Sequence, residues 1–544
     1  MTLWLALACV EPTPREPGVG VFLFEQQASW VRNFNPFAPT SARQPTGAGV
    51  YEPLMIYNPM EAAWVPWLAT EQQWLEQSEA SGGTLCFTTR QGVQWSDGEP
   101  FSARDVVFTF ELMRQHPGAD LGGVWGFLDS VSSPADDRVC FGFARPFVSG
   151  VEAVAQQAIV PAHIWSELED PLMFSNDDPV GTGPFTEVQI FNNQVFQLGA
   201  NPHYWQDLGL RAIRMPALAT NDSSTLALIQ GELDWAGLFV PAVDRVYIER
   251  DPEHFQAWFP TRGGTIFLYP NTTQPPLDDP RVRKALSLAI DRERMVDIAM
   301  YGYTTPSHPS GLSDGYTQWQ TDAEGWSHLD REQAAALLDE AGLTMGPKGW
   351  RTLPDGSPLN LSISCPAGWS DWVRAIQLIA RDLQAVGLNV KVAGSDYAAW
   401  YEQVSRGQFD LSMGWTESGP TPIAQYKALM HPANVKPVGE AAFRDWHRFG
   451  DPRAGELADR FEASTDPAEQ HAAILELGEI FLQQAPAIPL FPAPAWGESS
   501  SRHITGFPTP EDPYAVLSPN RTPGRLLIMT RLQPVPEELA GGRP

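Results

Sequence analysis

The sequence predicts an α/β protein built from more than one lobe, and three observations lead to this prediction. The chain has 544 residues, which exceeds the ~250–300 residues at which a single hydrophobic core stops growing. Short strand-like apolar runs alternate with segments whose apolar residues have helical spacing. The 50 prolines and 45 glycines separate these segments and indicate long connections. We therefore expect two or three lobes.

The expected elements follow in chain order. Residues 19–24 form a short apolar run that is typical of a strand. Asp279 and Asp466 each precede a proline, which suits the first position of a helix because the missing N–H needs no partner there. Ser102 and Asp105 have the spacing of a capping box. Helical spacing predicts helices at residues 103–114, 222–231, 279–301, 330–341, 372–386 and 467–484.

The composition excludes several classes of function. Hydrophobic residues make up 43% of the chain and charged residues 19%, which indicates a globular protein. The net charge is −29 and the isoelectric point is near 4.6. A surface this negative repels nucleic acid phosphates and anionic lipid headgroups. We expect no nucleic acid partner and no membrane binding through a basic patch.

The N-terminus contains a short apolar run that ends at Ala8 and Cys9. A polar, proline-rich stretch follows it. The run resembles the end of a bacterial lipoprotein signal peptide, although no Lys or Arg precedes it. We therefore expect residues 1–18 to be a lipoprotein signal and tether, with Cys9 as the lipidated residue. The alternative is an N-terminal segment with an incidental cysteine.

Three further cysteines are present. Cys86 and Cys140 each lie in a strand-like run, and two interpretations stay open for them. In an oxidising compartment they could form a disulfide that closes a loop of about 55 residues, worth ~4 kcal/mol in the chain-entropy model. They could also be buried free thiols, as we expect for Cys365. The sequence has no Cys-x-x-Cys motif or Cys/His cluster, so we expect no metal site and no cofactor.

Five segments in order resemble the large extracytoplasmic solute-binding proteins, family 5, of bacterial ABC importers, which include oligopeptide, dipeptide and nickel binders. They are WSDGEP at residues 95–100, DPVGTGPF at 178–185, NPHYW at 201–205, DPRVRKALSLAIDR at 279–292 and APAIPLF at 485–491. Gly181 and Gly183 in the second segment allow backbone conformations that other residues avoid. A strand-like run follows this segment, so it is not a phosphate-binding loop.

The resemblance implies a two-lobed periplasmic-binding-protein fold of type II, with an extra α/β subdomain on the first lobe. It implies a hinge that closes the lobes around a ligand. It also implies an extracytoplasmic location and a membrane permease as partner, and we expect a monomer. By this analogy the first lobe comprises residues 19–59, 180–260 and 490–544, the extra subdomain residues 60–179, and the second lobe residues 261–489.

Within the family the chain is most similar to the cello- and chito-oligosaccharide binders. In those proteins a Gly-Trp-x-Asp segment supplies a stacking Trp and an acid for sugar hydroxyls, which corresponds to Trp369 and Asp371 here. The stretch after Phe-Asp at residues 409–410 also lines the groove, which points to Trp415 and Glu417. Flat aromatic rings suit the apolar faces of a β-linked sugar. Further candidates for ligand contact are Asn33, Phe34, Trp235, Phe239 and Trp496.

One position departs from the oligosaccharide binders. Where the chito-oligosaccharide binders carry a second stacking Trp after Thr-Gly, this chain has Phe507. A peptide ligand is the alternative, because peptide binders of this fold fix the α-ammonium group with an Asp after the second-lobe Trp. Here Ser418 stands at about that position, and Glu417 could substitute for the Asp.

The sequence also offers one candidate for catalysis. Residues 311–315, Gly-Leu-Ser-Asp-Gly, match the pattern of a nucleophile elbow. An elbow needs a strand before the serine and a helix after it, and here both flanks read as loop. We therefore expect a binding protein without catalytic residues, and keep hydrolase only as a remote alternative.

Overall fold

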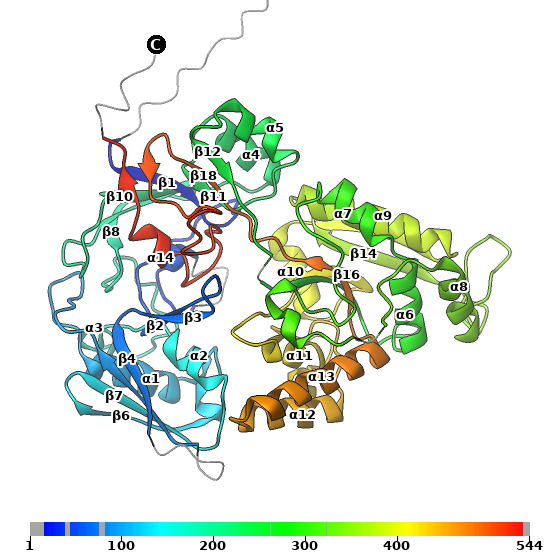
Figure 1. Cartoon of the computed structure of the whole chain (residues 1–544), viewed down its shortest axis with the longest axis horizontal. Helices are drawn as coiled ribbons and strands as arrows, with labels where there is room; N and C mark the ends of the chain where they lie inside the picture. Colours follow the sequence, from blue (N-terminus) through cyan, green and yellow to red (C-terminus); the bar gives the residue numbers. More distant parts are fainter. Residues whose placement is uncertain (1–15, 39–43, 76–81, 262, 323, 537–544) are drawn as a thin grey trace, which may run out of the picture.

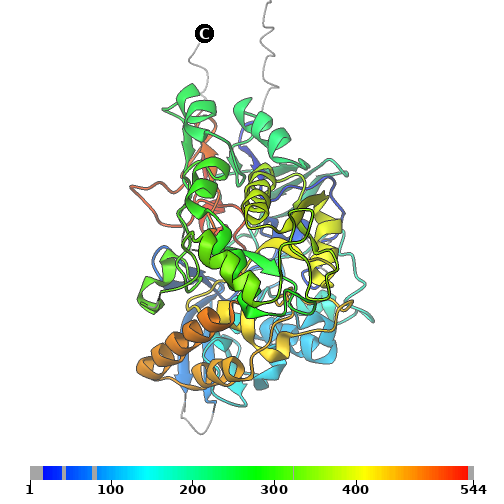
Figure 2. The ribbon, with the colours of Figure 1, turned by 90° about the vertical axis from the view of Figure 1, so that its right-hand side faces the viewer.

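The computed structural model describes residues 16–38, 44–75, 82–261, 263–322 and 324–536. Cys9 and the expected signal segment lie outside the described residues. The molecule has two lobes that lie side by side in Figure 1, and the view in Figure 2 looks at the second lobe with the first behind it. We call the part that contains the seven-stranded and four-stranded sheets the first lobe, and the part that contains the five-stranded sheet the second lobe. Within the described residues, no helix is long and apolar enough to cross a membrane.

The central sheet of the first lobe is mixed. Its core strand β1 (Val19–Leu23) is parallel to both of its neighbours and largely buried, as is typical of parallel strands. The strand order is β12 (Phe255–Ala257), β18 (Glu498–Ser500), β11 (Trp235–Ala236), β1, β10 (Ala212–Pro216), β9 (Val195–Ala200) and β8 (Phe185–Phe191).

A smaller antiparallel sheet extends the first lobe. Cys86 and Cys140 lie opposite each other in its two inner strands and are joined by a disulfide, so the first of the two interpretations is the correct one. The strand order is β4 (Ala69–Leu75), β5 (Thr84–Thr89), β7 (Arg138–Phe143) and β6 (Leu128–Ala135). Two short pairs complete the lobe: β2 (Met55–Asn58) with β3 (Ala63–Pro66), and β19 (Ile504–Thr505) with β20 (Gln533–Pro534).

One helix of the first lobe begins at a cap that the sequence predicts. The Ser102 hydroxyl accepts from the Arg104 N–H, and the Asp105 carboxylate accepts from the Ser102 N–H. These two bonds confirm the capping box. The helices of this lobe are α1 (Ala103–Gln115), α2 (Gly150–Ala155), α3 (Ala162–Trp165), α4 (Asn221–Ile229), α5 (Val243–Val246) and α14 (Leu526–Met529).

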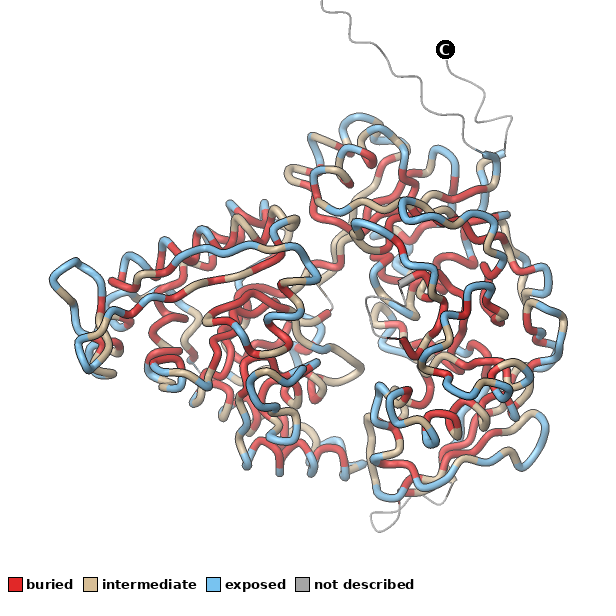
Figure 3. The backbone as a smooth tube through the Cα atoms, turned by 180° about the vertical axis from the view of Figure 1, so that it is seen from behind, coloured by how far each residue is buried: buried red, intermediate tan, exposed pale blue. Residues whose placement is uncertain are grey.

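The second lobe is a five-stranded sheet with helices packed around it. Its strand order is β15 (Asn389–Ser395), β14 (Asn360–Pro366), β16 (Leu411–Trp415), β13 (Thr265–Pro270) and β17 (Ile488–Pro492). The helices are α6 (Pro280–Ala289), α7 (Arg292–Ala299), α8 (Arg331–Glu340), α9 (Ser370–Ala385), α10 (Tyr397–Ser405), α11 (Ile423–Met430), α12 (Pro452–Ala463) and α13 (Pro467–Gln484). Figure 3 shows buried segments through the interior of both lobes and exposed residues along the outer helices.

One predicted helix is two helices in the structure. The expected helix at residues 279–301 breaks after Ala289, and a second helix begins at Arg292. Asp291 causes the new start, since its side chain accepts from the Arg294 backbone as an N-cap. Helices α10, α11 and α12 were not among the predicted ones.

The glycines of the DPVGTGPF segment serve close packing rather than an unusual backbone angle. A Cβ atom on Gly183 would lie 1.8 Å from the Gly49 carbonyl oxygen, and one on Gly181 would lie 2.0 Å from the Val50 carbonyl oxygen. Neither Gly181 nor Gly183 has a positive φ. The expectation of unusual backbone geometry at these two positions was therefore wrong.

Two chain segments connect the lobes. One runs from β12 to β13, and the other from β17 to β18. The segments bond to each other, because the Ala493 N–H donates to the Gly264 carbonyl at 2.9 Å and the Ala495 N–H to the Pro260 carbonyl at 3.1 Å. They therefore form a paired strap between the lobes. The domain boundaries stay a prediction.

Candidate ligand-binding site

A cavity of about 540 Å³ lies between the lobes, within the range of ligand sites in proteins. Part of its wall comes from the carboxyl ends of parallel strands in both sheets. Residues 25–27 follow β1 and residues 237–239 follow β11, which is parallel to β1. From the second lobe, residues 369–372 follow β14 and Trp415 ends β16, which is parallel to β14. This is the edge at which open α/β sheets bind ligands.

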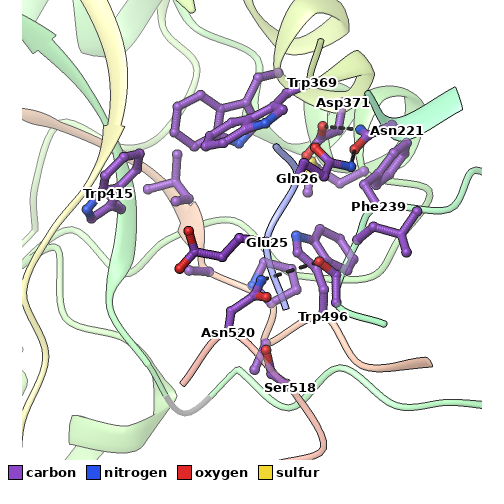
Figure 4. A pocket seen from close by; sticks show the side chains of 18 of the residues that line it. Glu25, Gln26, Asn221, Phe239, Trp369, Asp371, Trp415, Trp496, Ser518 and Asn520 are labelled. Carbon is purple, nitrogen blue, oxygen red and sulfur yellow. Dashed lines mark hydrogen bonds between the residues drawn. The ribbon is translucent and has the colours of Figure 1, made fainter. Parts of the chain in front are cut away.

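Aromatic rings line two sides of the cavity, as Figure 4 shows. Trp369 and Trp415 belong to the second lobe and are partly exposed, with ring centroids 6.2 Å apart. Trp496 of the connecting strap is also partly exposed and packs edge-on against Phe239, with ring centroids 5.6 Å apart. The cavity therefore has flat apolar surfaces on opposite sides.

Buried tryptophans hold the second-lobe rings in place. Trp369 packs edge-on against Trp372 at a centroid distance of 4.8 Å, and Trp415 against Trp446 at 5.2 Å. Trp400 is fully buried and lies 5.6 Å from the ring of Trp415. Because these neighbours restrict the rotamers, a ligand that stacks on the exposed rings need not order them.

A chain of hydrogen bonds crosses one end of the cavity. Gln26 donates to the Asn221 side-chain oxygen at 2.7 Å, and the Asn221 amide nitrogen donates to Asp371 Oδ1 at 3.1 Å (Figure 4). Gln26 and Asn221 belong to the first lobe and Asp371 to the second. Burial raises the pKa of Asp371 to about 6, while the hydrogen bonds act in the opposite direction.

The structure brings together five of the ten predicted ligand residues. Trp369, Asp371, Trp415, Phe239 and Trp496 all line the cavity. Asp371 is buried and already accepts from Asn221, so its Oδ1 is engaged by the protein.

The other five predicted residues lie elsewhere. Phe34 and Trp235 are fully buried, and Phe507 packs on Trp235 in the core of the first lobe, at a centroid distance of 5.9 Å. The Asn33 side chain accepts from the Asn35 backbone at 2.9 Å. Glu417 is exposed and lies 3.7 Å from Arg444. None of these five lines the cavity.

Several polar groups of the cavity were not predicted. Glu25, Gln26 and Asn221 line it from the first lobe. Their only sequence signal is position, since Glu25 and Gln26 directly follow the first strand and Asn221 starts a helix with a Thr cap. That signal could have been used only with the strand order known.

The serine of the Gly-x-Ser-x-Gly motif is not at an elbow. Ser313 is fully buried and its hydroxyl donates to the Gly263 carbonyl oxygen. A short 3₁₀ helix, Asp314–Trp319, follows it. The described residues contain no group of three or more His, Cys, Asp or Glu side chains arranged to hold a metal ion.

The chain matches the family model of the bacterial extracellular solute-binding proteins, family 5, over residues 63–437. This range covers more than half of the chain. The protein is a member of this family. The predicted fold class, a two-lobed binding-protein fold, is thereby confirmed.

Solved structures and curated relatives agree with this assignment. A mannohexaose-bound periplasmic oligopeptide-binding protein of an ABC transporter from Thermotoga maritima is 29% identical, with a TM-score of 0.87 over 96% of this chain and 99% of the other. The di/tripeptide-binding protein 2 of Pseudomonas aeruginosa is 24% identical, with 84% of this solute-binding protein and 86% of the relative covered. The nickel-binding periplasmic protein of Escherichia coli is 24% identical, with 73% and 76% covered. These relatives are binding proteins, not enzymes.

Proposed function

We propose that this protein is the substrate-binding component of an ABC importer and that it captures a β-linked oligosaccharide of the cello or chito type. The observation that carries the proposal is the pairing of exposed faces of Trp369, Trp415 and Trp496 with polar side chains in one cavity. Aromatic rings cover the C–H faces of a pyranose, and amides and carboxylates bind its hydroxyl rim. The mannohexaose-bound relative from Thermotoga maritima supports an oligosaccharide ligand.

The proposal includes the lobe motion and the partners. The two lobes close around the sugar at the paired strap and present it to a membrane permease. The protein acts outside the cytoplasm as a monomer, and Cys9 carries a lipid anchor. It performs no catalysis and uses no cofactor.

A peptide is the second candidate ligand. Glu25 places a carboxylate in the cavity, where it could bind the α-ammonium group of a peptide. The di/tripeptide-binding relative from Pseudomonas aeruginosa supports this candidate about as well as the mannohexaose-bound protein supports a sugar.

Calorimetric titration separates the two candidates. The purified protein is titrated with cello- and chito-oligosaccharides and with short peptides, and each ligand that binds is tested for thermal stabilisation. Binding of a β-linked sugar without hydrolysis is the expected result. Binding of peptides but of no sugar would contradict the proposal, and release of shorter sugars would show an enzyme.

A further inference from the structure

A second cavity adjoins the first. Its volume is about 240 Å³. Ser418, Asn520 and Arg521 line both cavities, so these three residues mark the place where the two meet. The polar residues that line the second cavity away from this junction belong to the first lobe and are Tyr57, Asn58, Glu152, Gln156 and Thr522.

The Arg521 side chain is a partly buried cation at this junction. It packs against the strap, since a Cβ atom on Gly263 would lie 2.2 Å from Arg521 Nη2. Among the residues that the structure describes, its guanidinium has neither an ion pair nor a hydrogen bond. Burial lowers its pKa, and the electrostatic effect of Tyr316 acts in the other direction.

Several other buried arginines of this protein donate to protein oxygens, although the Nε atoms of Arg448 and Arg525 have no partner. Arg292 donates to the carbonyl oxygens of Pro489 at 2.7 Å and Ser287 at 2.9 Å. Arg283 likewise donates to the Ala485 carbonyl at 2.9 Å. A guanidinium has five N–H donors, and leaving them unpaired away from water is costly. Arg448 and Arg525 still donate from a terminal nitrogen, to the Ser405 carbonyl and the Thr522 hydroxyl. Within the described residues, the Arg521 guanidinium makes no such bond.

The neighbouring carboxylates do not neutralise Arg521. Glu25 lines the first cavity, but its charge acts on Arg525, whose guanidinium lies over the Phe24 ring at 4.4 Å. Glu152 lines the second cavity and contacts Gln156, whose amide donates to it at 3.1 Å. The pKa of Arg521 is set by burial and Tyr316, and neither of these carboxylates is among its causes. An anionic group of the ligand could therefore pair with Arg521.

We propose that Arg521 binds a carboxylate of the ligand at the junction of the two cavities. A guanidinium matches the two oxygens of a carboxylate with parallel N–H donors, and such charged pairs are stronger than bonds to neutral hydroxyls. The inference rests on the proposed function for its sugar component, and on that basis the ligand is an acidic oligosaccharide with a uronic or aldonic acid unit. The C-terminus of a peptide is the other source of the same chemical group.

The test compares acidic and neutral ligands of equal length by calorimetry. The probes are cellotriose, its C1-oxidised aldonic acid, the same trisaccharide with a glucuronic acid at the non-reducing end, trialanine and trialanine amide. We expect one acidic sugar to bind at least about tenfold more tightly than cellotriose. Arg521→Gln should remove this preference, so that binding of the acidic sugar weakens at least about tenfold more than binding of cellotriose. Arg104→Gln, which removes a side chain that is 78% exposed, is the matched control and should change neither value.

The outcomes separate this inference from the proposed function. Equal binding of acidic and neutral sugars overturns the role of Arg521 but not the sugar proposal. Binding of trialanine but not of its amide or of any sugar, with loss in Arg521→Gln, supports the carboxylate site and overturns the sugar proposal. If Arg521→Gln does not fold, the unaltered protein is titrated at low and at high salt concentration. A preference for the acidic sugar that falls with ionic strength supports an ionic contact, and a preference that does not change overturns it.

Discussion

Glu462 and Ser149 join the two lobes at a point away from the strap, since the Ser149 N–H donates to Glu462 Oε2 at 3.0 Å. Glu462 is fully buried near the end of α12, and Ser149 precedes α2 of the first lobe. The Val148 N–H donates to the Glu462 carbonyl at 2.9 Å, and Lys427 Nζ lies 2.7 Å from Glu462 Oε1. The Glu462 carboxylate thus contacts Lys427 of its own lobe and Ser149 of the opposite lobe.

Replacing this carboxylate should weaken ligand binding. Glu462→Gln turns one acceptor into a donor that faces either Lys427 or the Ser149 N–H, so a charge-assisted bond between the lobes is lost. We expect about tenfold weaker affinity in calorimetry. Glu456→Gln, an exposed position of the same helix, is the control. Unchanged affinity in Glu462→Gln would mean that this contact makes no contribution to closure.

Ligand affinity should depend on pH through Glu152. Burial, followed by the charges of Glu417 and Glu462, raises the pKa of Glu152 to about 7. The basic groups nearby are engaged, with Lys427 on Glu462 and Arg444 close to Glu417. Glu417 and Glu462 belong to the second lobe, so separating the lobes should return the pKa toward its ordinary value.

Glu152 therefore binds a proton more tightly in the closed form than in the open form. This difference stabilises the closed form at low pH, and the stabilisation is lost as pH rises through about 7. We expect affinity to rise severalfold, at most about tenfold, between about pH 8 and about pH 6. Glu152→Gln should remove most of this dependence. Calorimetry of both proteins at the two pH values checks it, and an equal pH dependence in the two would rule Glu152 out.

The stability of the first lobe should depend on pH through Glu52. This carboxyl is fully buried and accepts from Trp67 Nε1 at 2.6 Å and from the Tyr204 hydroxyl at 2.8 Å. Burial nevertheless raises its pKa from 4.5 to about 7. The folded state therefore prefers the protonated form, and stability falls as pH rises from about 4.5 through about 7.

The expected loss from this group is on the order of 3 kcal/mol. Glu52→Gln keeps the neutral form at every pH, so its denaturant midpoint should fall less than that of the unaltered protein between about pH 5 and about pH 8. Parallel changes in the two proteins would assign the pH dependence to other groups.

The disulfide should stabilise the four-stranded sheet. It links residues 54 apart in sequence, for which the chain-entropy model gives ~4 kcal/mol. Alkylation of the unfolded, unreduced protein should modify Cys365, which is a buried free thiol in the structure, but not Cys86 or Cys140. Reduction should expose both and lower the melting temperature. Labelling of Cys86 without reduction would contradict the bond.

Short sequence patterns such as helix caps predicted the helices better than they predicted the residues of the cavity. The caps at Ser102, Asp279 and Asp466 could be identified in the sequence because they act within one helical turn. Asp291 carried the same signal, but the continuous apolar spacing around it concealed the break between α6 and α7. The missed helix α12 begins with another Asp-Pro pair, at Asp451.

The site depended on contacts that local signals do not encode. Trp369 and Trp415 were found through segments that also carry the family resemblance. Trp235 belonged to a similar segment, yet its ring is buried and donates to the Leu517 carbonyl at 2.6 Å. Gln26 and Asn221 meet Asp371 only because parallel strands of two sheets end at one cavity, and strand order is a long-range property.

Trp369 should supply the main stacking surface for the sugar. Its ring is partly exposed to the cavity and is held by Trp372 behind it. Trp369→Ala should lose roughly 1–3 kcal/mol of binding to a neutral β-oligosaccharide, by analogy with aromatic stacking on bases. Trp350→Ala is the control, because this ring is 37% exposed and lies outside both cavities. Calorimetry with the two variants measures the difference, and circular dichroism verifies that both are folded. Equal affinity in the two variants would remove Trp369 from the site and leave Trp415 and Trp496 as the remaining candidates for stacking.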